Sequence, residues 1–149
     1  MKMIKIVVFS LLLTSISLAT EIQIAQIKGE KFLGIRGNSV QIKLGKQICS
    51  LKSLGEQRKN NFRIEFSCNN ITQILFDTEK IIESGGKYSV DEPLFSLLWA
   101  GDKDNDGKID LLMEMSPKYS YSKKVTFLST KAKNPNLLGI ADIKRESFD

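Results

Sequence analysis

The run from Asp102 to Asp110 reads Asp-Lys-Asp-Asn-Asp-Gly-Lys-Ile-Asp and puts acids at loop positions 1, 3, 5 and 9, with Gly107 at position 6. Hard oxygen ligands at this spacing converge on one cation when the backbone turns sharply at the glycine. We therefore predict a Ca²⁺ site. Its predicted ligands are the side chains of Asp102, Asp104, Asp106 and Asp110 and the main-chain carbonyl of Lys108.

An acidic surface turn is the plain alternative, because Asp, Asn and Gly also favour tight turns. Four acids within nine residues repel one another unless a cation screens them, and a simple turn does not require Asp at every second position. The spacing therefore favours Ca²⁺. Mg²⁺ is less favoured because it keeps several waters and seldom uses a dedicated protein cage.

The loop differs from an EF-hand, which carries a bidentate Glu at position 12 between two helices. Position 12 here is Met113, and the flanking residues alternate between apolar and polar as in strands. Asp110 or water must then complete the site. Glu114 comes one residue late for the helical geometry and stays open as a helper.

At these residues the chain resembles two groups of proteins. The loop with its strand flanks resembles the Ca²⁺ loops of FG-GAP, integrin-type β-propeller repeats, which share the pattern Asp-x-Asp-x-Asp-Gly-x-x-Asp. The wider stretch from Leu98 to Leu112, and on to Thr126-Phe127-Leu128-Ser129, resembles small uncharacterised secreted bacterial proteins with a Trp-Ala-Gly-Asp-x-Asp-x-Asp-Gly-x-x-Asp-Leu-Leu core. A propeller needs several blades of about 40 residues, whereas the motif occurs once here. The resemblance implies Ca²⁺ binding in an exported protein, with no activity attached.

The N-terminus has the three parts of an export signal. Lys2 and Lys5 precede an apolar run over residues 6–13, and Ser17-Leu18-Ala19 supplies small residues for cleavage. We predict a signal peptide over 1–19 and a single β-rich domain over 20–149. The apolar run is shorter than the ~20 residues of a membrane span, and no cysteine directly follows it. These features predict a periplasmic or secreted product without a stable membrane anchor.

Export places Cys49 and Cys68 in an oxidising compartment, where an even number of cysteines can pair completely. A disulfide between them would close a loop of about 20 residues and stabilise the fold by roughly 3 kcal/mol. The alternative is two buried thiols. A catalytic cysteine is not favoured, because the chain contains no histidine to activate it.

Alternating apolar residues predict half-buried antiparallel strands joined by short turns. The predicted strands cover residues 31–36, 39–44, 47–51, 62–68, 71–76, 94–100, 109–115, 125–129 and 137–143, with a short helix over 77–84 and a frayed tail over 144–149. Phe95, Leu97 and Trp99 should share an inner face, with Trp99 mostly buried. The predicted fold class is mainly β: one antiparallel meander or sandwich-like domain with a strand-loop-strand Ca²⁺ site and at most one short helix.

Composition narrows the function classes. Without histidine, Ser-His and Cys-His nucleophile systems and most zinc sites are excluded. The chain has 22 basic and 17 acidic residues, and loss of Lys2 and Lys5 leaves 20 against 17. This mild, scattered charge does not predict a nucleic-acid partner. Lys123-Lys124 beside Tyr119 and Tyr121 stays open as a stacking platform for a sugar or as a solvent-facing strand edge.

We therefore predict an exported protein with a structural Ca²⁺, which acts as a binding or structural module and meets a protein or glycan partner in the cell envelope. Two alternatives stay open. One is a glycosidase-like hydrolase that uses a pair of carboxylates, drawn from Asp77, Glu79, Glu83, Asp91 and Glu92. The other is an inhibitor or accessory subunit that binds through a sheet edge. The absence of histidine makes an enzyme the less favoured class.

Overall fold

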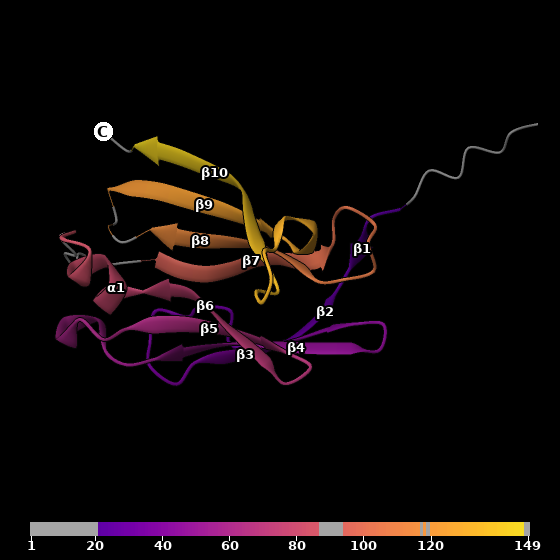
Figure 1. The fold of residues 1–149 in the computed structure, drawn as a ribbon, viewed down its shortest axis with the longest axis horizontal. Coiled ribbons are helices and arrows are strands. Elements are labelled where there is room, and N and C mark those ends of the chain that lie inside the picture. The colour runs from indigo at the N-terminus through magenta and orange to yellow at the C-terminus, as the bar shows by residue number, and fades with distance from the viewer. Residues whose placement is uncertain (1–20, 87–93, 117, 119, 148–149) are drawn as a thin grey trace, which may run out of the picture.

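The computed structural model of the chain describes residues 21–86, 94–116, 118 and 120–147. The predicted signal peptide, Asp91, Glu92 and Tyr119 lie outside the described residues. Within them the protein is mainly β, with two antiparallel sheets and one short helix (Figure 1). The predicted fold class is therefore confirmed.

Among the described residues, each sheet has five strands. We call one the N-terminal sheet, with the order β2-β3-β4-β5-β6, and the other the C-terminal sheet, with the order β1-β7-β8-β9-β10. The strands are β1 (Gln23–Ile24), β2 (Gln26–Gly29), β3 (Ser39–Leu44), β4 (Gln47–Leu54), β5 (Arg63–Cys68), β6 (Ile71–Asp77), β7 (Leu94–Asp102), β8 (Asp110–Ser116), β9 (Tyr121–Leu128) and β10 (Gly139–Ser147). Consecutive strands pair as two meanders, β3 to β6 and β7 to β10.

The core contains the apolar residues of both sheets. On β3 and β5 every second residue is buried, as the alternation predicts. On β8, Leu111 and Met113 are fully buried. Aromatic rings add to the core: the Phe95 ring lies 5.3 Å from that of Phe62 and 4.8 Å from that of Phe76, measured between centroids.

The N-terminal segment joins the two sheets. β1 pairs with β7 and β2 pairs with β3, while the Ala25 N–H between them donates to the Ala100 carbonyl at 3.0 Å. Further along, the Leu33 N–H donates to the Phe95 carbonyl at 2.7 Å. The predicted hairpin between residues 31–36 and 39–44 is therefore wrong. The partner of β3 is β2, because residues around Leu33 contact β7 instead.

A β-bulge between Leu97 and Trp99 corrects a second prediction. The extra residue reverses the alternation, so Ala100 takes the inner position and Trp99 pairs with half-buried Leu112. Trp99 consequently lies half-buried on the outer side, so its predicted place on the inner face with Phe95 and Leu97 is wrong. Its ring lies over Gly101, where a Cβ would come within 2.6 Å of the indole and 2.2 Å of the Gln23 carbonyl oxygen.

The predicted short helix is confirmed as α1 (Thr78–Glu83), and the Asp77 carboxylate caps it by accepting from the Glu79 N–H at 3.0 Å. The predicted frayed tail is wrong up to Ser147, because residues 144–147 pair with β9 as part of β10. Within the described ranges, no helix is long and apolar enough to cross a membrane.

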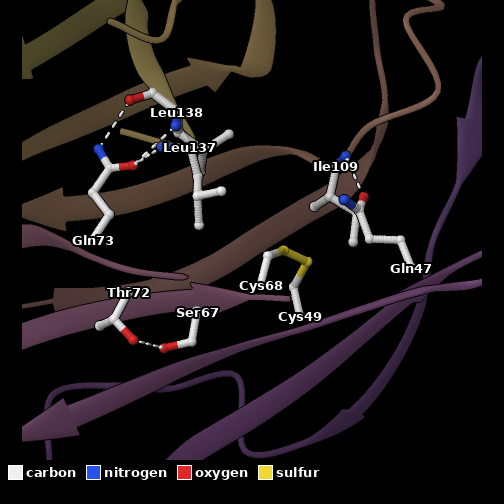
Figure 2. Close-up of a disulfide and its surroundings, with 9 residues drawn as sticks. All are labelled: Gln47, Cys49, Ser67, Cys68, Thr72, Gln73, Ile109, Leu137 and Leu138. Carbon is white, nitrogen blue, oxygen red and sulfur yellow. Dashed lines mark hydrogen bonds between the residues drawn. A yellow bond between two sulfur atoms is a disulfide. The ribbon is translucent and has the colours of Figure 1, made fainter. Parts of the chain in front are cut away.

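The predicted disulfide is present. Cys49 on β4 and Cys68 on β5 lie directly opposite in the ladder, with their Cα atoms 4.4 Å apart. Both are buried, with exposed fractions of 2% and 4%. The pair lies on the inner face of the N-terminal sheet (Figure 2) and fits a protein of an oxidising compartment.

Candidate metal centre

The acidic loop connects β7, which ends at Asp102, to β8, which begins at Asp110. Asn105 and Gly107 both have positive φ, 61° and 79°, which turn the loop back on itself. The two oxygens of the Asp102 carboxylate accept from the backbone N–H groups of Asp106 at 3.1 Å and of Gly107 at 2.8 Å. The loop is therefore wrapped around the side chain at its first position.

This wrapping brings three of the predicted ligands together. Asp102, Asp104 and Asp106 each offer one carboxylate oxygen, and these oxygens lie within 4.8 Å of one another. Asp102 is buried at 4% exposure. The Oδ1 atom of Asp104 is also buried, and it has no hydrogen-bond partner among the described residues. Three carboxylates at this separation repel one another, and a cation between them would remove the repulsion. The cluster could therefore hold a metal ion.

Asp110 lies at the other end of the loop and is fully buried. Its Oδ2 accepts from the Lys103 N–H at 2.7 Å and its Oδ1 from the Ser129 N–H at 2.8 Å. Burial raises the pKa of the Asp110 carboxyl, the two N–H donors oppose that rise, and the nearby Asp104 and Asp106 charges add to it. Asp110 thus fastens the loop to the end of β9. Its role as a metal ligand stays a prediction.

The Lys108 backbone is fixed by its N–H, which donates to Asp106 Oδ1 at 2.9 Å. Whether its carbonyl binds metal stays a prediction as well. Glu114 lies four residues beyond Asp110 on β8, or about 13 Å at the usual rise. Its carboxylate accepts from Ser116, Ser122 and the Lys123 N–H. Glu114 is therefore too distant to help at the loop.

Two hydroxyl groups complete the environment of the triad. Ser129 Oγ donates to Asp106 Oδ2, and Thr130 Oγ1 donates to Asp104 Oδ2. Both residues belong to the 3₁₀ turn Ser129–Lys131 after β9. The sequence interpretation missed them because they stand 23 and 26 residues from their partners. Antiparallel pairing gives the missing signal, since the end of β9 must lie beside the start of β8.

One side chain connects this loop to the opposite sheet. Gln47, at the start of β4, accepts from the buried Ile109 N–H through its Oε1 atom at 3.0 Å. Figure 2 shows this contact beside the disulfide. It satisfies a backbone donor that would otherwise be orphaned at the entrance to β8. Gln47 was also missed, because its partner lies 62 residues away.

The acids proposed for a hydrolase do not form a comparable cluster within the described residues. Asp77 caps α1, and Glu79 and Glu83 are exposed along that helix. No protein-family model, curated protein or solved structure matches the chain.

Proposed function

We propose that this is an exported Ca²⁺-binding β protein whose metal ion stabilises the fold. The observation that carries the proposal is the Asp104 Oδ1 atom, a buried carboxylate oxygen without a donor inside a cluster of three acids. A buried anionic oxygen without a partner is costly in free energy. A cation bound by Asp102, Asp104 and Asp106 would satisfy it and offset the repulsion among the three charges.

The chemistry of the donors favours Ca²⁺ over other divalent cations. The cluster offers carboxylate oxygens and no nitrogen or sulfur ligand, which suits a hard cation. Ca²⁺ accepts irregular sets of six to eight oxygens, so a backbone carbonyl, the second lone pairs of Asp110 and water can complete the shell. In an exported protein a dissociation constant of about 10⁻⁴ to 10⁻³ M is sufficient, as in other extracellular modules.

The position of the cluster supports a structural role for the ion. The loop is bonded to Ser129 and Thr130 after β9 and to Gln47 on β4. An ion held there would fix the ends of three strands of the C-terminal sheet and their contact with the N-terminal sheet. The loop lacks the position-12 Glu of EF-hands, which favours stabilisation over a conformational switch.

We further propose that the protein is a binding or structural module of the cell envelope with a protein or glycan partner. The Cys49–Cys68 disulfide supports the oxidising location. Beside the metal loop, Trp99 and Lys103 line a groove of about 270 Å³ on the outer side of the C-terminal sheet. An indole and a lysine that line the same groove suit a sugar ring or a peptide side chain.

The test is calorimetric titration of Ca²⁺ into metal-free protein, with Asp104→Asn as the disabled variant. The amide keeps the size of the side chain and the Thr130 contact but removes the charge. Asn105→Gly is the matched control, because glycine tolerates the positive φ at this position. We expect single-site binding in the wild-type protein and in the control, and none in Asp104→Asn. No heat of binding at millimolar Ca²⁺ in the wild-type protein would refute the proposal.

A further inference from the structure

The β10 strand is the long open edge of the molecule within the residues that the structure describes. The edge of β7 is covered by β1 and by Leu33, and β2 has only four residues. The β6 edge is partly covered by residues 137–138, because the Gln73 side chain makes hydrogen bonds of 2.9 Å with the backbone of Leu137 and Leu138 (Figure 2). β10 is nine residues long, and Figure 1 shows it as the outermost strand of its sheet.

The side chains of β10 are exposed along almost the whole strand. Every residue after Gly139 is exposed, including Ile140 at 58% and Ile143 at 36%. A long exposed edge presents unpaired N–H and C=O groups to any strand that can align with it. Main-chain hydrogen bonds can then provide the affinity, and side-chain pairs determine which strand fits.

The charges on β10 are unfavourable as they stand. Lys144 lies opposite Lys124 of β9, and Arg145 lies opposite Lys123. Like charges directly opposite in a ladder are destabilising. Burial and the neighbouring Arg145 both lower the pKa of Lys123. Four basic residues therefore stand in two adjacent pairs. Lys124 also faces Glu114 of β8, but Lys144 faces Lys124 alone, so negative charge on the open side of β10 would offset the repulsion at Lys144.

We propose that β10 pairs antiparallel with β10 of a second copy, about a two-fold axis at Ile143, so that Asp142 of each copy faces Lys144 of the other. Lys144 then lies between Lys124 on one side and a carboxylate on the other. Ile143 meets its own counterpart, so its partly exposed side chain is covered. The two sheets become one continuous sheet of ten strands.

The charges select this register over its neighbours. In a two-fold pair the residues that face each other must lie on the same side of the sheet, so registers change in steps of two. One step away in either direction, Asp142 faces Asp142 or Lys144 faces Lys144. The next register on the C-terminal side puts Arg145 opposite Arg145. Only the pairing centred on Ile143 combines two opposite-charge pairs with an apolar centre.

The bulge between Ile140 and Asp142 limits the length of the paired segment. Regular pairing then extends over about five residues around Ile143, which is far below the contact area of permanent dimers. We therefore expect a weak, reversible dimer with a dissociation constant in the micromolar to millimolar range.

Charge reversal gives a sharp test of this register by sedimentation velocity. Asp142→Lys puts lysine opposite Lys144, and Lys144→Asp puts aspartate opposite Asp142, so each variant alone should dimerise at least about tenfold more weakly than the wild-type protein. An equimolar mixture of the two variants should dimerise again. One variant carries positive charge at both positions and the other carries negative charge at both, so opposite charges face each other in the mixed dimer. The double variant Asp142→Lys/Lys144→Asp should also dimerise as the wild-type protein does, because the exchanged charges still face opposite charges across the two-fold axis.

A cysteine cross-link provides an independent readout. Ile143→Cys should form an intermolecular disulfide on mild oxidation, because the two-fold axis brings the two cysteines together. Lys46→Cys, on the exposed turn between β3 and β4, is the control and should cross-link far less. Wild-type protein that stays monomeric up to about 1 mM would overturn the proposal. A dimer that survives both single charge reversals would overturn it too, since its interface must then lie elsewhere.

Discussion

Two neighbouring strands of the N-terminal sheet are joined by a covalent bond, whereas two strands of the C-terminal sheet are joined through a loop of three clustered acids. Cys49 and Cys68 are neutral, buried and paired with each other. Asp102, Asp104 and Asp106 repel one another, and one of their buried oxygens has no partner. The first connection is complete in the protein alone, whereas the second could hold a cation that would pair its charges.

The two connections lie close together in the molecule. Gln47 stands two residues before Cys49 on β4 and accepts from the Ile109 N–H at the end of the acidic loop. The loop therefore rests on a strand that the disulfide already holds in place. This contrast predicts that loss of the disulfide weakens the protein with or without metal, whereas changes at the loop alter its response to metal.

The largest expected effect is loss of the disulfide. Replacing both cysteines, Cys49→Ala with Cys68→Ala, should lower the free energy of unfolding by about 3 kcal/mol, because the unfolded chain regains the entropy of a closed loop. Denaturant unfolding with and without Ca²⁺ measures it. The loss should be the same in both conditions. If the loss of stability disappears when Ca²⁺ is present, the disulfide and the acidic loop do not stabilise the fold independently.

Ca²⁺ itself should give the next largest effect. At about 100 times its dissociation constant, an ion that binds only the folded state adds roughly 2.7 kcal/mol and raises Tm by several degrees. Asp104→Asn should reverse the order of stability: without metal the variant should melt above the wild-type protein, since repulsion is relieved, and with metal below it. Differential scanning calorimetry checks this crossing. Equal melting of both proteins under both conditions would mean that Asp104 neither repels its neighbours nor binds metal.

Ser129 and Thr130 should tune the affinity of the site without supplying its charge. Removing either hydroxyl, by Ser129→Ala or Thr130→Val, should weaken Ca²⁺ binding about tenfold, as is usual for groups that orient metal ligands. The fold should persist in both variants. Ser50→Ala, on the opposite sheet, is the control for a lost hydroxyl. Unchanged Ca²⁺ affinity in both variants would show that the triad needs no support from β9.

Local features of this protein could be predicted from the sequence, whereas contacts between distant segments could not. The clustering of Asp102, Asp104 and Asp106 could be predicted because all three acids lie in one short loop. The short helix that begins at Thr78 could be predicted because its sequence signals are local as well. Ser129 and Gln47 could not, because each meets the loop through strand pairing between distant segments. Trp99 was placed on the wrong face because a single inserted residue reverses the alternation, and nothing in the apolar pattern marks that bulge.

Gln47→Leu tests the contact between the two connections. The leucine fills similar space but leaves the buried Ile109 N–H without an acceptor, which should cost about 1 kcal/mol. Its effect should appear both without metal and with it, as for the disulfide. Amide hydrogen exchange should show faster exchange at Ile109 in the variant than in the wild-type protein. Unchanged protection there would mean that the Gln47 side chain does not hold the loop.

Lys123 should give the smallest effect, and its sign follows from its pKa. Burial lowers the pKa of this ammonium below its ordinary value of 10.5, and Arg145 adds to the shift. The folded state therefore binds this proton less tightly than the unfolded chain does. The resulting loss of folding stability is fully present at neutral pH and fades as the pH rises from the lowered pKa toward 10.5.

Lys123→Met should raise Tm at pH 7 by about 2 °C or less, because the residue is only partly buried. The advantage over the wild-type protein should shrink at alkaline pH, while the exposed control Lys131→Met should show neither the gain nor its pH dependence. A gain that stays constant up to pH 11 would mean that apolar packing, rather than charge burial, produces it.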